Sequence, residues 1–105
     1  MKPADLARST IVQTRAIAAA TADPETMLYV QLCLSRCFAG DWGTVPAEDA
    51  ALNDEAIAEG EGRILAAYPQ QGKLTDKIWI IAYFSESNPE NIDYNNVTIL
   101  YPDEY

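Results

Sequence analysis

The sequence contains no histidine, and this absence narrows the chemistry that the chain can perform. Histidine is the commonest general base, and the Ser-His and Cys-His pairs of nucleophilic enzymes depend on it. No glycine-rich phosphate loop of the known form is present either. The adjacent acids Glu48-Asp49 and Asp54-Glu55 fall on a predicted solvent-facing helix, where catalytic carboxylates are rare. The sequence therefore predicts no catalytic residue and no cofactor, and we expect a protein that is not an enzyme.

Long apolar runs are also missing. No stretch approaches the roughly 20 apolar residues of a transmembrane helix. Residues 1–5 lack the long apolar core of a signal peptide. We therefore expect no contact with a membrane and a cytoplasmic protein.

Metal ligands are scarce. There are two cysteines, Cys33 and Cys37, four positions apart in a helical pattern. A disulfide at that spacing inside a helix would be strained, so we expect two buried free thiols. The adjacent acids Asp103-Glu104 are too few for a calcium site. The sequence therefore predicts no metal site.

Basic residues are few and unevenly placed, which gives a net charge of −9. Between residues 37 and 62 there are acids but no Lys or Arg, and residues 78–105 show the same pattern. Such a surface disfavours direct binding of nucleic acid and favours a basic protein partner. The alternative is that the acidity only keeps the domain soluble. The candidate partner-binding residues are the acids of the first stretch: Asp41, Glu48, Asp49, Asp54, Glu55, Glu59 and Glu61.

The first half of the chain predicts helices. Residues 5–20 are compatible with one continuous helix, or with a short edge strand over 9–13 followed by a helix that Thr14 caps. A second helix is predicted from the cap at Asp23 to residue 39, with Gly40 just beyond its end. We expect that helix to be largely buried, because its apolar positions wrap more than half of its circumference.

A tight turn and a third helix follow. The turn is Gly-Asp-Trp-Gly at residues 40–43, and Trp42 either fills the core or anchors a partner, of which the first is the commoner use. A helix over residues 46–59 is expected to lie on the surface and to end at Gly60. Its apolar stripe is thin: Ala50, Leu52, Ala56 and Ile57.

The second half predicts strands over residues 63–68, 77–84 and 96–101, with a polar loop over 85–95. The run 77–84 is apolar at both alternate sets of positions, which is typical of a central strand covered on one face and at least partly on the other. Consecutive strands with short connections form a meander. The predicted fold is therefore a single α+β domain over residues 1–105, with N-terminal helices packed on one face of a three-stranded antiparallel meander.

Several segments resemble a family of small uncharacterised proteins encoded on bacterial plasmids, phages and integrative elements. They are the Gly-Asp-Trp-Gly turn at 40–43, Gly-Arg-Ile-Leu at 62–65, Lys-Ile-Trp-Ile-Ile at 77–81 and Thr-Ile-Leu-Tyr-Pro-Asp-Glu-Tyr at 98–105. This chain departs from the family pattern in the longer connection over residues 85–95. The resemblance implies a mobile-element context and brings no catalytic residues with it.

Two functions follow as hypotheses. The first is a non-enzymatic inhibitor or binder of a basic, nucleic-acid-binding host defence protein, of the anti-CRISPR or antirestriction type that imitates DNA. The second is an accessory structural or maintenance protein of a plasmid or phage, whose acidity serves only solubility. That protein could be a homodimer joined through the last strand, which no sequence feature protects from edge pairing.

Overall fold

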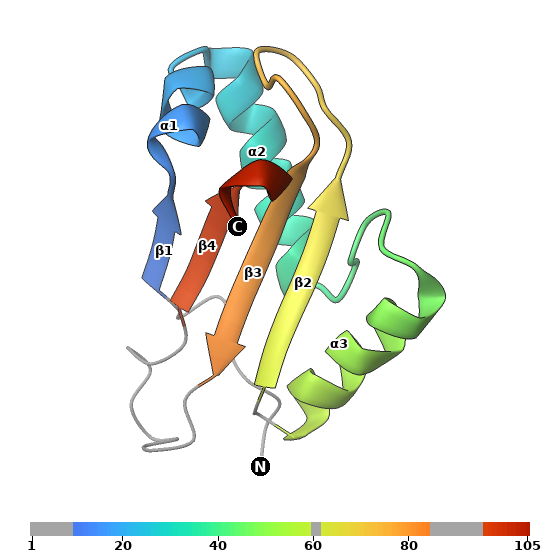
Figure 1. Ribbon diagram of the computed structural model, residues 1–105. Helices are drawn as coiled ribbons and strands as arrows, with labels where there is room; N and C mark the ends of the chain where they lie inside the picture. Colours follow the sequence, from blue (N-terminus) through green and yellow to red (C-terminus); the bar gives the residue numbers. More distant parts are fainter. Residues whose placement is uncertain (1–9, 60–61, 85–95) are drawn as a thin grey trace.

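The computed structural model describes residues 10–59, 62–84 and 96–105 of the chain. The predicted loop over 85–95, the predicted helix end at Gly60 and the acid Glu61 lie outside these ranges. Three helices, four strands and one short 3-10 turn follow one another (Figure 1): β1 (Thr10–Gln13), α1 (Arg15–Thr21), α2 (Pro24–Phe38), α3 (Ala47–Glu59), β2 (Gly62–Tyr68), β3 (Ile78–Phe84), β4 (Asn96–Leu100) and η3 (Pro102–Glu104).

The four strands form one mixed sheet in the order β1-β4-β3-β2. Strands β2, β3 and β4 make the predicted antiparallel meander. The prediction of three strands is wrong, because β1 adds a fourth that runs parallel to β4. Thr10 lies opposite Asn96, and no local sequence pattern indicates a pairing over that separation. The α+β class is confirmed.

The start of the described chain decides between the two alternatives for residues 5–20. A strand followed by a capped helix is correct, and one continuous helix is wrong. The Thr14 side chain accepts a hydrogen bond from the Ile17 amide at 3.4 Å, which caps α1. The Thr14 amide donates to the Ile99 carbonyl at 3.1 Å and so continues the contact with β4 beyond the strand.

The position of β4 corrects a second expectation. The last strand is not an edge, since β1 and β3 flank it. The sheet instead ends at β1 on one side and at β2 on the other. The expectation that the last strand forms an exposed edge, through which a homodimer was to be joined, is therefore wrong.

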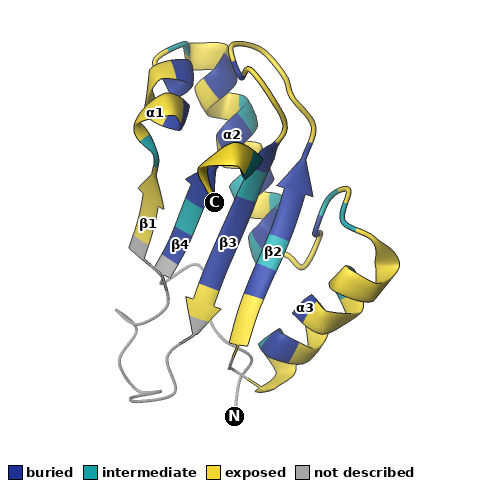
Figure 2. Cartoon of the chain, viewed as in Figure 1, coloured by how far each residue is buried: buried dark blue, intermediate teal, exposed yellow. Residues whose placement is uncertain are grey.

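The main core lies between the sheet and helices α1 and α2, which cover the same face (Figure 1). From β3, Ile78, Ile80 and Ala82 point into it and are buried. The buried side of α2 includes Val30 and Cys33 (Figure 2). Burying each large aliphatic side chain contributes roughly 1.5–3 kcal/mol.

The other face of β3 is only partly covered, as expected for this strand. Ile81 is buried, Trp79 is half-buried and Tyr83 is exposed. The Trp79 ring meets the Tyr105 ring edge-on, with centroids 5.8 Å apart. Turn η3 crosses this face near the upper end of β3 in Figure 1. Trp79 is therefore packed by the C-terminal residues and not by the main core.

Helix α2 is correctly bounded but not largely buried. The Asp23 carboxylate accepts from the Thr26 amide at 3.0 Å at one end, and Gly40 follows the other end with φ +86°. The sheet covers only one side of the helix. Leu28 and Leu32 point away from it and are exposed, which contradicts the expectation from the apolar count.

Cys33 and Cys37 are buried free thiols, as predicted. Burial raises the pKa of Cys37 to about 12, so little thiolate forms near neutral pH. We expect a thiol reagent to label the native protein at least about 100-fold more slowly than the unfolded chain, because the thiolate is the reactive form and must first be exposed. Unfolding without reductant should release two reactive thiols per chain. Rapid labelling of the folded protein would show that this side of α2 is open.

Candidate acidic interface on α3

Helix α3 is held to the sheet by one polar side chain, Asn53. Its Nδ2 donates to the Leu65 carbonyl at 2.8 Å, and its Oδ1 accepts from the Leu65 amide at 3.1 Å. The side chain is only 3% exposed. It therefore satisfies the backbone groups of β2 that a neighbouring strand would otherwise pair. In Figure 1, α3 stands beside β2 and apart from the other helices.

The turn before α3 covers the next part of the same edge. The Ala67 amide donates to the Trp42 carbonyl at 3.1 Å, and the Thr44 amide donates to the Ala67 carbonyl at 2.8 Å. Trp42 is buried, so its interpretation as a core residue is confirmed. The edge of β2 is thus closed to further pairing at Leu65 and Ala67. Natural sheets often protect an edge strand by covering it with a helix or a loop in this way.

The outward side of α3 carries an acidic stripe, which we define as Glu48, Leu52, Glu55 and Glu59. All four residues are exposed. At about 100° per residue these positions fall within about 60° of one another around the helix, well away from the buried Asn53. Leu52 forms the edge of the stripe that is nearer to the buried Ala56 and to the sheet. The sequence expectation had placed Leu52 on the inward side, and this is wrong. Leu52 is 61% exposed, since Asn53 takes the inward position.

Two of the predicted interface acids also make bonds within the fold. Asp41 forms an ion pair with Arg36, with Nε and Oδ2 2.8 Å apart, and accepts from the Gly43 amide at 3.1 Å. These bonds, the one with Arg36 first, lower the pKa of Asp41. Asp54 accepts a hydrogen bond from Trp42 Nε1 at 2.9 Å. Asp41 therefore ties the turn to the end of α2, and Asp54 ties it to α3.

Asp49 lies on the flank of the stripe, at a hollow of about 250 Å³ between α3 and the sheet. The hollow is also lined by Leu52, Leu65, Arg63 and Trp79. The Arg63 guanidinium donates to the Tyr105 hydroxyl at 2.7 Å. The structure thus brings Asp49 close to the stripe but separates Asp41 and Asp54 from it.

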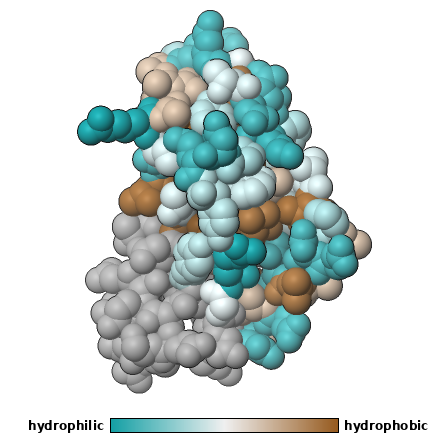
Figure 3. Space-filling model, in the orientation of Figure 1, coloured by the Kyte–Doolittle hydropathy of each residue, from teal (hydrophilic) through white to brown (hydrophobic). Residues whose placement is uncertain are grey.

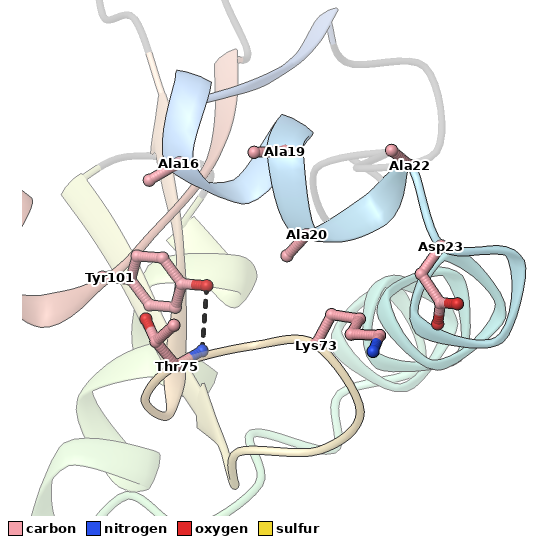
Figure 4. A pocket seen from close by; sticks show the side chains of 8 residues that line it. All are labelled: Ala16, Ala19, Ala20, Ala22, Asp23, Lys73, Thr75 and Tyr101. Carbon is pink, nitrogen blue, oxygen red and sulfur yellow. Dashed lines mark hydrogen bonds between the residues drawn. The ribbon is translucent and has the colours of Figure 1, made fainter.

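A second hollow, of about 650 Å³, lies between α1 and the connection from β2 to β3 (Figure 4). The alanines of α1 form one wall, with Lys73, Thr75 and Tyr101 opposite. The Thr75 amide donates to the Tyr101 hydroxyl at 3.2 Å. At the rim, the Asp23 carboxylate is bonded to Thr26, which lowers the pKa of Asp23. These polar groups are occupied with one another or spread along the rim, and they do not converge on one point.

Comparison with protein families, with curated proteins and with solved structures found no match for this chain. No helix in the described ranges is long and apolar enough to cross a membrane. Within the same ranges, no group of three or more potential metal ligands comes together.

Proposed function

We propose that this chain is a mobile-element protein that binds, without catalysis, a basic nucleic-acid-binding host protein and inhibits it through the outward side of α3. The observation that carries the proposal is the acidic stripe. It stands on a helix that projects beside the sheet. Arg36–Asp41 is the one ion pair among residues 10–59, 62–84 and 96–105, so no described base neutralises the stripe.

The spacing along the stripe supports an imitation of DNA. At 1.5 Å per residue, Glu48 and Glu55 are separated by about 10 Å along the axis, and Glu55 and Glu59 by about 6 Å. Along one strand of duplex DNA, three and two nucleotide steps cover about 10 Å and 7 Å. A groove that contacts every third and then every second phosphate along one strand would therefore meet carboxylates at similar axial intervals.

The exposed Leu52 favours binding over solubility. A surface that serves only solubility gains nothing from a large apolar side chain between its acids. Figure 3 shows an apolar side chain among hydrophilic ones over α3. In a complex, such a residue would be the apolar anchor inside a polar rim, which is the usual anatomy of an interface. The second hypothesis, an accessory protein that is acidic only for solubility, gives Leu52 no role.

The test uses a double charge reversal, Glu55→Lys with Glu59→Lys. Neither side chain makes a described contact with the rest of the fold. The circular dichroism and melting temperature of the double variant should therefore stay near those of the wild type. Asp54 must be left unchanged because it bonds to Trp42. In bacteria that carry a CRISPR or restriction system, the wild type should restore transformation by a targeted plasmid, and the double variant should not. Once the partner has been co-purified with the wild-type protein, the rate at which the two associate should fall as the salt concentration rises.

The matched control is Asp76→Lys with Asp103→Lys, which changes the net charge equally at exposed positions away from α3. It should inhibit as the wild type does. Equal activity of both double variants would remove α3 as the interface and would favour solubility as the reason for its acids.

A further inference from the structure

The outer side of α2 is an apolar surface on an otherwise acidic protein. Leu28 is 66% exposed and Leu32 57% exposed, and Met27 lies beside them at 36%. Gln31 and Ser35 fill the positions between, and both are exposed and uncharged. In the described structure this side of the helix points away from the sheet, which covers Val30, Cys33 and Cys37.

The arrangement of these residues is self-complementary. A two-fold axis near residues 30–31, perpendicular to the helix, generates an antiparallel copy of α2 facing the first. A residue of one copy then lies opposite a residue of the other copy when their two residue numbers add up to about 61. Leu28 meets Leu32 of the second copy, and Met27 meets Leu34. Gln31 lies near the axis and meets itself. Such reciprocal pairing is what a two-fold interface requires.

The charges follow the same symmetry. Helix α2 carries one acid, Glu25 in its first turn, and one base, Arg36 in its last turn. On a helix of about 100° per residue both lie on the same flank of the Leu28–Leu32 line. The two-fold axis therefore places each Glu25 opposite Arg36 of the other copy. Arg36 binds Asp41 through Nε and Nη2 and lies over the Tyr68 ring. In the dimer, Nη1 would be the nitrogen that bonds to Glu25 of the second copy.

We infer that the outer side of α2 is a homodimer interface in which two copies of the helix pack antiparallel. A chain with a net charge of −9 repels its own copies, so self-association needs a surface where acids are balanced. The outer side of α2 meets that condition, whereas the acidic stripe on α3 does not. In the dimer both copies of α3 stay outside the interface, and the assembly presents two acidic stripes.

The first test is the mass in solution, measured by light scattering over roughly a hundredfold range of concentration, since a dimer equilibrium follows mass action. The wild type should approach twice the monomer mass as the concentration rises. Leu28→Glu and Leu32→Glu should each remain monomeric, with unchanged circular dichroism, because both side chains are exposed in the monomer. The control is Leu52→Glu, an equally exposed leucine on α3, which should dimerise as the wild type does. A monomeric wild type at every concentration overturns the inference, and so does dimerisation of both α2 variants.

The second test determines the direction of packing. In an antiparallel pair with its axis near residues 30–31, the two copies of position 31 are neighbours, whereas the two copies of position 35 are about 13 Å apart along the axis. A short thiol-reactive cross-linker should therefore join Gln31→Cys chains into dimers and leave Ser35→Cys chains separate. The native cysteines are buried and do not compete. Cross-linking of both variants alike would indicate parallel packing and overturn this arrangement.

Discussion

Replacing Gly43 with alanine should lower the free energy of unfolding by about 4 kcal/mol or more, which is at the upper end for a single substitution. Gly43 has φ +74°, a conformation that costs a residue with a side chain about 1–2 kcal/mol. A Cβ atom at this position would lie 1.8 Å from the Ala67 carbonyl oxygen. Because that oxygen belongs to the backbone of β2, the turn or the strand must move. Chemical denaturation monitored by tryptophan fluorescence would measure the loss, since Trp42 is the neighbouring residue.

Gly40→Ala is the matched control. Gly40 has a similar φ of +86°, but a Cβ atom there would meet nothing within 4 Å. Gly40→Ala should therefore lower the free energy of unfolding by the conformational strain alone, about 1–2 kcal/mol. Gly40→Val should lower it somewhat more, because the valine side chain is branched. Equal stability of the Gly40 and Gly43 variants would show that Gly43 is not pressed against β2.

Asn53→Ala should be the second most damaging change, with a loss of about 3 kcal/mol. It removes two hydrogen bonds and leaves the amide and carbonyl of Leu65 without partners beside a buried side chain. Each such unsatisfied group costs about 1–3 kcal/mol. Hydrogen exchange should also show the effect locally, because the Leu65 amide would become unprotected before the rest of β2. The neighbouring Leu52→Ala should change stability by only about 0.5 kcal/mol, as expected for an exposed position.

Asn53→Asp gives the same site a pH dependence of known sign. The new carboxylate can still accept from the Leu65 amide, but it faces the Leu65 carbonyl without a hydrogen to donate. Burial and this repulsion should raise its pKa in the folded state above the unfolded value of about 3.9. The folded state then binds more protons, so the variant should lose stability relative to the wild type as pH rises from 5 to 8. A deficit that does not depend on pH would show that position 53 is open to water.

Sequence patterns predicted the elements whose signals are local. Asp23, Pro24 and Gly40 mark the ends of α2 through capping and left-handed geometry, and the apolar run 78–84 identifies the central strand. These features depend on a few neighbouring residues, so they can be recognised without knowing the fold.

The features that were left open or missed depend on contacts between distant segments. A strand near residues 9–13 was one of two alternatives, but its parallel pairing with β4, more than eighty residues later, was not predicted. Asn53 is turned toward the sheet because β2 offers backbone groups to bond, which an apolar pattern does not reveal, and Leu52 is left exposed. Asp54 appears in the sequence as one more surface acid, and its bond to Trp42 depends on how the turn folds back on the helix.

The parallel pairing of β1 with β4 also has a consequence for the order in which the sheet assembles and opens. Strands β2, β3 and β4 can pair through neighbouring connections, but β1 must wait for a partner that is far away in the chain, and such contacts form slowly. One hydrogen bond from Thr14 Oγ1 to Glu104, 2.8 Å long, reinforces the junction after the strand. A short outer strand held in this way has the features of the unit that detaches first in partial unfolding. Its release would uncover the backbone edge of β4, which no sequence feature protects against pairing with another chain.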